Sequence, residues 1–422
     1  MNKRVRTKAG LLILTLLLLP LPIIACAPGE VAPPEPAEKV IKVGISLDLT
    51  GPYSPAFTAG VLPATLDYVK HVNKQGGING IRVEGLWTDS RSDPSVAIVA
   101  YKRFKQQGII AMYTGTSSDT LAILSMLEAD KISATGTAVS KGLLVPPGWY
   151  FCARSEMGLM MSTALDAYYN RVWKEKGPDR PMRVAILAWG NVLGRTGAEG
   201  IIHWAKAYPE KAELVADLYT SPMSLDYSTE LLLIKSEDVD VLACTISGAA
   251  YGAAVRDAGR VGLSEDIPIF LEQSCFGEAN YAIGGDDFTR VWTAASDALT
   301  YEDEAGVNLA KKLIAEYHPE LTLGQAYMYG HLVSTILFEA VTRALDKVGY
   351  EALNGAAIKE HGFEAIKDWN AGLGAPISYA DYPGDRMGQE RLRLWHFSTA
   401  RGGPEAVSDW FDLLSFADIN WE

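Results

Sequence analysis

The sequence predicts an α/β protein with two doubly wound sheets, and three observations lead to this prediction. Short apolar segments rich in β-branched residues alternate with segments of helical spacing over residues 40–128. The same alternation begins again after Pro178, and glycine or proline marks many of the boundaries. Strands that alternate with helices indicate βαβ units and a parallel sheet. Two separate runs of this kind favour two sheets over one large sheet.

Each element of the first run is predicted from its own pattern. The β-branched run VIKVGISL begins the first strand, and the glycines of GGING at residues 76–80 end the helix that follows it. The predicted strands are 40–47, 81–88 and 109–114, and the predicted helices are 59–74, 94–107 and 120–128.

The second run repeats this order with similar lengths. Its predicted strands are 183–189, 212–219, 239–245, 267–271 and 291–294, and its predicted helices are 197–208, 228–236 and 249–261. In open α/β sheets, ligands bind beyond the carboxyl ends of the strands. Two sheets that face each other therefore place their loops around one shared cleft.

The first 39 residues predict export rather than part of the fold. Four basic residues precede a short apolar run at 11–19, and Ile-Ile-Ala-Cys ends at Cys26. This order resembles a bacterial lipobox and predicts a lipoprotein signal peptide over 1–25, with lipidation of Cys26. An ordinary secretory signal is the alternative. Residues 26–39 are rich in Pro, Ala and Glu, which favours a semi-rigid tether to an extracytoplasmic, membrane-anchored body.

Composition excludes several classes of function. The net charge of −13 argues against binding to nucleic acid or to anionic lipid, so the lipid anchor is the only predicted membrane contact. Apolar residues make up 48% of the chain, enough for a large core. Cys152, Cys244 and Cys275 have no metal or redox spacing. Cys244 and Cys275 follow neighbouring strands, so either a disulfide or two buried thiols fits.

Four motifs together resemble the leucine/isoleucine/valine-binding protein family. They are ISLDLTGP at 45–52, NKQGGING at 73–80, DSRSDP at 89–94 and RDAGRVGL at 256–263. The resemblance extends over residues 40–397. It implies a type I periplasmic binding protein fold, in which two α/β lobes are joined by a three-segment hinge. It also implies an extracytoplasmic protein that captures a small solute by hinge closure and delivers it to the permease of an ABC transporter.

The resemblance also divides the chain into lobes. Residues 40–158 with 295–375 correspond to lobe 1, and residues 159–294 with 376–422 correspond to lobe 2. The three hinge segments are expected near Arg154, near Ala295 and near Pro376.

Two loops of lobe 1 are expected to contact the ligand. The loop TGTSSD at 114–119 follows a strand and begins a helix, where hydroxyls and amides favour an anion. By resemblance, the carboxylate-binding serine falls on Ser117 or Ser118. Simple helix capping is the alternative. In the loop SATGT at 133–137, Gly136 and Thr137 occupy a second binding position of the family, although an ordinary βα turn fits as well.

Lobe 2 is expected to supply an acid. The family has an acid after a lobe 2 strand that pairs with the ammonium of the ligand, and Glu272 falls there. A buried ammonium requires such a partner. The alignment slips by one residue, so Gln273 is the alternative at this position, and a solvated loop acid is the other explanation for Glu272.

The pocket departs from that of the amino-acid binders. Leu193 replaces a pocket tyrosine, and Trp189 lies four residues before it in the sequence. Tyr53, Trp149, Trp189 and Tyr327 would suit a planar or aromatic carboxylate as aromatic walls, and packing in the core is the alternative for each. The predicted ligand is therefore an amino acid or an aromatic or planar carboxylate.

No motif suggests an enzyme, a metal or a cofactor. HExxH, GxSxG and Walker A sequences are all missing, and the six histidines have no metal-ligand spacing. The sequence thus predicts a solute-binding protein without metal or cofactor. A lipid-anchored hydrolase of a small amide or ester is the alternative from another class, and it requires a cleft serine backed by a histidine. A ligand-sensing subunit of a membrane receptor is the third possibility.

Overall fold

Two mainly parallel sheets organise the computed structural model, which describes residues 38–380, 386–398 and 403–421. Residues 39–422 form one compact unit. The predicted signal peptide and Cys26 lie outside the described residues, as does the tether before Glu38. The predicted α/β fold with two doubly wound sheets is confirmed. Within the described residues, no helix combines the length and hydropathy that crossing a bilayer requires.

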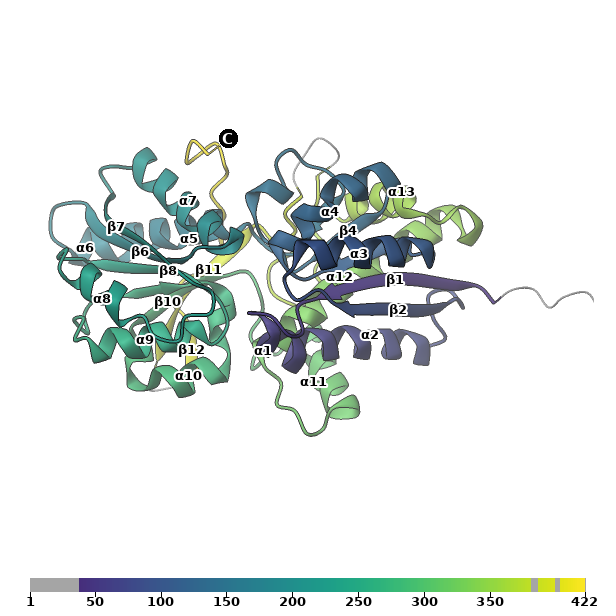
Figure 1. Cartoon of the computed structure of the whole chain (residues 1–422), viewed down its shortest axis with the longest axis horizontal. Coiled ribbons are helices and arrows are strands. Elements are labelled where there is room, and N and C mark those ends of the chain that lie inside the picture. Colours follow the sequence, from purple (N-terminus) through teal and green to yellow (C-terminus); the bar gives the residue numbers. More distant parts are fainter. Residues whose placement is uncertain (1–37, 381–385, 399–402, 422) are drawn as a thin grey trace, which may run out of the picture. The chain divides into compact units, whose positions relative to one another are not determined.

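The first sheet is entirely parallel and has the strand order β2-β1-β3-β4-β5. Helices cover both of its faces, and we call the sheet with these helices lobe 1 (Figure 1). Its strands are β1 (Val40–Leu47), β2 (Arg82–Asp89), β3 (Ala111–Thr114), β4 (Ser133–Gly136) and β5 (Tyr150–Cys152). Its helices are α1 (Ser54–Ala56), α2 (Leu62–Lys74), α3 (Pro94–Gln106), α4 (Ser117–Asp130), α11 (Ala305–Tyr317), α12 (Gln325–Val348) and α13 (Gly355–Ala357).

The second sheet has the order β12-β11-β10-β9-β8-β6-β7, and β13 also pairs with β11. The strands from β7 to β10 are parallel, whereas β11 and β12 are antiparallel additions. Its strands are β6 (Met182–Trp189), β7 (Ala212–Thr220), β8 (Val241–Thr245), β9 (Ile269–Leu271), β10 (Val291–Ala295), β11 (Arg391–Ser398), β12 (Gly403–Ala406) and β13 (Phe411–Asp412).

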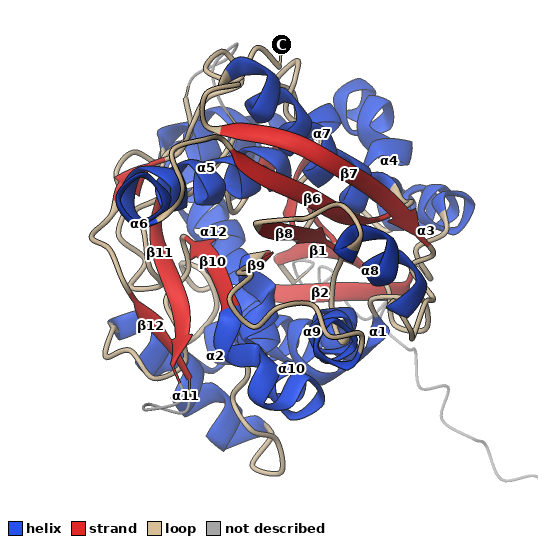
Figure 2. Ribbon diagram, turned by 90° about the vertical axis from the view of Figure 1, so that its left-hand side faces the viewer, coloured by secondary structure: helices blue, strands red, loops and turns tan. Residues whose placement is uncertain are grey.

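We call the second sheet with its helices lobe 2. Figure 2 shows α5 and α7 on one face of this sheet and α8, α9 and α10 on the other. The bounds are α5 (Met157–Tyr168), α6 (Lys174–Lys176), α7 (Val192–Ala207), α8 (Ser228–Lys235), α9 (Ala250–Arg260) and α10 (Glu278–Gly284). One apolar cluster is continuous from the α3 and α4 face of lobe 1 to the α5 and α7 face of lobe 2.

Polar caps begin the helices that lie nearest the cleft. The Thr116 side chain caps α4 by accepting from Asp119 N–H, and the Asn191 side chain caps α7 by accepting from Gly194 N–H. Each cap satisfies one first-turn amide that has no partner within the helix. Both caps directly follow strands, so they fix where the cleft loops turn.

The chain crosses between the lobes three times, and the third crossover lies later than predicted. Ile377 and Tyr379 pack in the core of lobe 1, and Met387 pairs with Cys152 at the end of β5. These residues therefore belong with lobe 1, and the predicted hinge at Pro376 is wrong. The third crossover leads from Gln389 into β11.

Hydrogen bonds tie the first crossover to the third, and the second crossover to a loop of lobe 2. Ser155 in the first crossover donates to the carbonyl of Gln389 at 2.6 Å. The N–H of Ser296 in the second crossover donates to the side chain of Gln273 at 2.8 Å. The thiols of Cys244 and Cys275 are free and buried, so the disulfide alternative is wrong.

Glu156 is a buried carboxyl in the first crossover. Its Oε2 accepts from the N–H of Leu159 at 2.8 Å, whereas Oε1 has no hydrogen-bond partner among the described residues. Burial raises the pKa of Glu156 to about 8, against the opposing effect of the helix amides. The folded state therefore holds a proton at neutral pH that the unfolded chain releases.

This proton predicts a pH dependence of stability. The pKa is raised on folding, so the contribution is fully present below about pH 4 and is lost as pH rises through about 8. Relative to Glu156→Gln, the wild-type free energy of unfolding should fall by up to roughly 1.4 kcal/mol per pH unit between pH 5 and 8. Urea unfolding at several pH values measures this difference. Glu175→Gln, at an exposed position on α6, is the control and should follow the wild type. If the free energy of unfolding depends on pH in the same way for the wild type and for Glu156→Gln, the raised pKa of Glu156 is contradicted.

Candidate functional site

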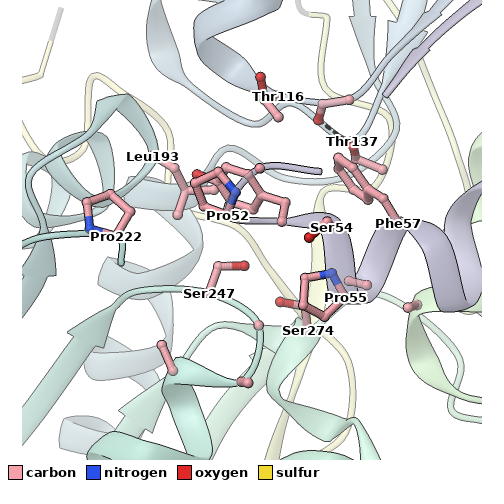
Figure 3. A pocket seen from close by; sticks show the side chains of 18 of the residues that line it. Pro52, Ser54, Pro55, Phe57, Thr116, Thr137, Leu193, Pro222, Ser247 and Ser274 are labelled. Carbon is pink, nitrogen blue, oxygen red and sulfur yellow. Dashed lines mark hydrogen bonds between the residues drawn. The ribbon is translucent and has the colours of Figure 1, made fainter. Parts of the chain in front are cut away.

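A cavity of about 410 Å³ lies between the carboxyl ends of the strands of the two lobes (Figure 3). This is where parallel α/β sheets bind ligands, and the volume lies within the range of small-molecule sites. Lobe 1 lines it with residues 50–57, Val61, Gly115, Thr116, Ser117, Thr137, Val139, Arg154, Gln325, Ala326 and Tyr329. Lobe 2 lines it with Trp189, Leu193, residues 222–225, residues 247–250, Glu272 and Ser274.

The turn after β1 forms one wall, and a buried acid holds it in place. The Asp48 carboxylate accepts from the N–H of Gly51 at 2.5 Å, from the N–H of Tyr53 at 3.0 Å and from the hydroxyl of Ser92 at 2.7 Å. A Cβ on Gly51 would lie 2.5 Å from that carboxylate, so only glycine fits there. The turn is therefore fixed before any ligand binds.

Tyr53 reaches from this wall to lobe 2. Its hydroxyl accepts from Nδ2 of Asn191 at 2.9 Å, and its ring meets the edge of the Trp189 ring with centroids 5.8 Å apart. Trp189 in turn donates from Nε1 to the hydroxyl of Tyr227 at 3.2 Å. The lobes thus touch at an aromatic corner of the cavity. Burial raises the pKa of Tyr53, so its hydroxyl stays protonated.

The predicted hydroxyl loops reach the cavity, and each hydroxyl makes a hydrogen bond within lobe 1. The Thr137 hydroxyl donates to the carbonyl of Gly115 at 2.5 Å, and the Ser117 hydroxyl accepts from the N–H of Val139 at 3.2 Å. A Cβ on Gly136 would lie 1.9 Å from the carbonyl oxygen of Thr114. Close packing between neighbouring strands therefore explains this glycine.

Arg154 is the central charged group of the site. It lies in the first crossover, almost fully buried, and its Nε donates to Oδ1 of Asp297 at 2.9 Å while Nη2 pairs with Oδ2. Nη1 lies 3.8 Å from Oε1 of Glu272, and the guanidinium lies 3.0 Å from the centroid of the Tyr329 ring. Arg154 therefore joins two crossovers to a loop of lobe 2.

The surrounding charges decide the ionisation of this cluster. Burial alone lowers the pKa of Arg154, but the charges of Asp297 and Glu272 raise it above its usual range. Burial raises the pKa of Asp297, and the Arg154 charge opposes that effect. An arginine between two acids forms a buried charge cluster that is costly to break by removing its one cation.

Glu272 lines the cavity and uses one of its carboxylate oxygens for hydrogen bonds within the protein. Oε2 accepts from the hydroxyl of Tyr251 at 3.1 Å, from the N–H of Ser274 at 2.9 Å and from the hydroxyl of Ser274. Among the described residues, Oε1 receives only the 3.8 Å approach of Arg154. Gln273 points into the crossover, so it is not the cavity residue at this position.

The structure brings five of the predicted site residues to the cavity. These are Tyr53, Ser117, Thr137, Trp189 and Glu272. Three others do not line it, which corrects their prediction: Ser118 lies one position further along the first turn of α4, Gly136 packs against β3, and Tyr327 is buried in the core of lobe 1.

Tyr329, and not the predicted Tyr327, lies in the cavity wall. The Tyr327 hydroxyl donates to Oδ2 of Asp67 at 3.0 Å, on the side of α12 that faces α2. The sequence did not indicate Tyr329, Met223 or Leu225. It placed Arg154 only in a hinge, although a lone arginine in the apolar run YFCARSEMGLMM was a signal of a paired buried charge.

The arrangement suits binding rather than catalysis. Among the described residues that line the cavity there is no histidine, which is the base that the hydrolase alternative requires. The described residues contain no group of three His, Cys, Asp or Glu side chains that could hold a metal ion. A two-lobed α/β fold with a cavity between its lobes and its crossovers tied together defines the class of two-lobed binding proteins.

Comparison with known proteins assigns the family. The chain belongs to the periplasmic binding protein family, whose sequence model matches residues 40–395, and this family consists of extracytoplasmic binding proteins rather than enzymes. The predicted family resemblance is confirmed. No curated protein matches the sequence.

Solved structures share the fold at low sequence identity. A branched-chain amino acid ABC transporter protein from Thermus thermophilus with bound valine has a TM-score of 0.80 and 18% identity, covering 91% of this chain and 100% of its own. A fatty acid ABC transporter substrate-binding protein from Thermomonospora curvata has a TM-score of 0.74 and 20% identity, and the match covers 89% of this chain and 92% of its own. An ABC transporter solute-binding protein from R. palustris in complex with benzoate has a TM-score of 0.71 and 16% identity, and the match covers 87% of this chain and 96% of its own.

The Arg154 cluster predicts a large loss of stability when its cation is removed. Arg154→Ala leaves Asp297 and Glu272 as uncompensated acids and should lower the free energy of unfolding by about 3–5 kcal/mol, measured by urea unfolding. Arg391→Ala removes a 3.6 Å ion pair of exposed side chains and should cost no more than about 1 kcal/mol. Equal losses in the two variants would show that the cluster is not a compensated buried group.

Proposed function

We propose that this protein captures a small organic solute in the cavity between its lobes and delivers it to the permease of an ABC transporter. The observation that carries the proposal is the cavity itself, which is lined by both lobes and bordered by the buried Arg154 cluster. A solute that touches both lobes binds the closed arrangement better than the open one and so favours closure. A permease that recognises the closed form would then receive only loaded protein.

The structural relatives support a solute with an apolar part. Their bound or named solutes are valine, benzoate and fatty acids, which differ in length and charge distribution but share an apolar body. The cavity of this chain has apolar walls from Phe57, Leu193, Met223 and Leu225, together with several prolines. An amino acid and an aromatic carboxylate remain the family expectations for the solute.

Filling the cavity should abolish binding without unfolding the protein. Ser247 lies on a loop that faces the cavity (Figure 3), and Ser247→Trp should occupy the space meant for the solute. In a thermal-shift screen of amino acids, aromatic acids, fatty acids, amines and amides, a wild-type hit at 100 times its Kd should add about 2.7 kcal/mol of stability. Ser247→Trp should lose that shift.

Ser236→Trp is the matched control, because Ser236 is exposed at the end of α8 outside the cavity. It should keep every hit. If Ser247→Trp retains the wild-type shifts, the solute binds elsewhere and the proposed site is wrong.

We also propose that the chain is anchored by lipid at Cys26, after removal of residues 1–25, with 26–39 as the tether. The basic, apolar and small-residue order before Cys26 supports this proposal. Cys26→Ala should prevent lipidation and move the protein from the membrane fraction to the soluble extracytoplasmic fraction. Labelling with a palmitate analogue in the expressing bacterium, followed by fractionation, measures both effects.

Cys244→Ala keeps the apolar environment of a buried thiol and is the control, and it should stay labelled and membrane-bound. A labelled Cys26→Ala variant would contradict the anchor.

A further inference from the structure

The charges around the cavity define what kind of head group it accepts. Among the described residues, the charged side chains that line it are Arg154 and Glu272. Arg154 is already paired with Asp297 on one side and covered by the Tyr329 ring on another. One cation between two acids leaves a net negative charge, and the open acceptor is Oε1 of Glu272. A positively charged group is favoured beside it, because an opposite charge offsets the excess acid.

The place where a carboxylate would be expected is poorly suited to an anion. The hydroxyl proton of Thr137, one of the two predicted carboxylate-side hydroxyls that line the cavity, is used on the carbonyl of Gly115. The first turn of α4 also contains Asp119, a buried acid. Burial raises the pKa of Asp119 to about 6, so it is mainly ionised at neutral pH. Its charge opposes the attraction of the helix N-terminus for an anion.

Aromatic rings support the same conclusion. Tyr53, Phe57 and Trp189 line the cavity from both lobes, whereas the Tyr329 ring is already occupied by Arg154. Aromatic faces attract ammonium groups through their quadrupoles and do not attract carboxylates.

The residues at the rim of the cavity indicate the chemistry of the rest of the ligand. Met223 and Leu225 follow β7 in lobe 2 and are 70% and 84% exposed, although they line an apolar cavity. Exposed apolar side chains at the mouth of a site lose that exposure when an apolar group fills it. In the view of Figure 3, Pro222 and Leu193 lie across the cavity from Phe57, so an apolar path leads away from the lobe 1 wall.

We propose, resting on the proposed solute-binding function, that the ligand is an apolar monoamine. Its ammonium head lies against Glu272, and its body extends to Met223 and Leu225 at the rim. It has no carboxylate. A volume of about 410 Å³ leaves room for a body longer than the side chain of a branched amino acid.

Calorimetric titration of the purified protein with three matched series tests this proposal. The probes are straight-chain primary amines, the carboxylates of the same chain lengths and the α-amino acids with the same side chains. The amines should bind most tightly, with the association constant rising about fourfold per methylene until the rim is reached. Glu272→Gln should weaken amine binding at least about tenfold. Glu213→Gln, at an exposed position of lobe 2, should not.

The rim is tested by a matched pair of double variants. Met223→Ser with Leu225→Ser should flatten the dependence on chain length for the longest amines and leave the shortest unchanged. Leu232→Ser with Leu233→Ser removes two apolar side chains that are each 55% exposed on α8, outside the cavity. This double variant should leave the binding of both the longest and the shortest amines unchanged.

Tighter binding of the carboxylates or amino acids than of the amines would overturn the proposal, and so would an absence of length dependence. In those cases the cavity still binds a solute, and the proposed function stands. If no amine binds but another solute of the broader screen does, only the monoamine is rejected. If Ser247→Trp and the wild type behave alike towards every solute, the proposed function fails as well.

Discussion

The buried pair of Arg154 and Asp297 is the interaction on which the two-lobed arrangement depends. Arg154 lies in the crossover that leaves β5, and Asp297 lies in the crossover that leaves β10, so the pair joins two chain segments that connect the lobes. Neither charge is stable alone in a buried position, because its desolvation has to be compensated by an opposite charge and by hydrogen bonds. The pair therefore fixes the crossovers relative to each other. Ser155 extends this link to the third crossover through the carbonyl of Gln389.

The cavity walls follow from the same need to satisfy buried polar groups. Asp48 holds the turn after β1 by accepting from two backbone amides, and the Asn191 side chain caps α7 while also donating to Tyr53. Thr137 uses its hydroxyl proton within lobe 1. The protein thus supplies many of the partners for its own polar groups, and few remain for a ligand. Glu272 lines the cavity and is one exception, since among the described residues its Oε1 has only a long approach from Arg154.

Much of the fold could be predicted because strands and helices have different periodicities that are visible locally. The cavity position of residues such as Ser117 and Glu272 could be predicted, because they come directly after predicted strands. The residues of α12 could not be placed in this way. Successive helical residues are rotated by about 100°, so positions two apart point to nearly opposite sides, and Tyr327 faces the core where Tyr329 faces the cavity. The third crossover was also placed too early, because the contact of Met387 with β5 joins residues far apart in the sequence.

The positions of these charges also determine how closure responds to a solute. Arg154 and Asp297 both lie on crossovers, so their pair does not have to break when the lobes separate. Glu272 lies on a loop of lobe 2, and its 3.8 Å distance from Arg154 depends on how the lobes face each other. Across the cleft, Tyr53 makes one hydrogen bond and one aromatic contact, worth about 0.5–1.5 kcal/mol each. Such contacts bias closure only slightly by themselves. Under the proposed function, the occupant of the cavity, by its differential affinity for the closed arrangement, then decides which conformation the permease meets.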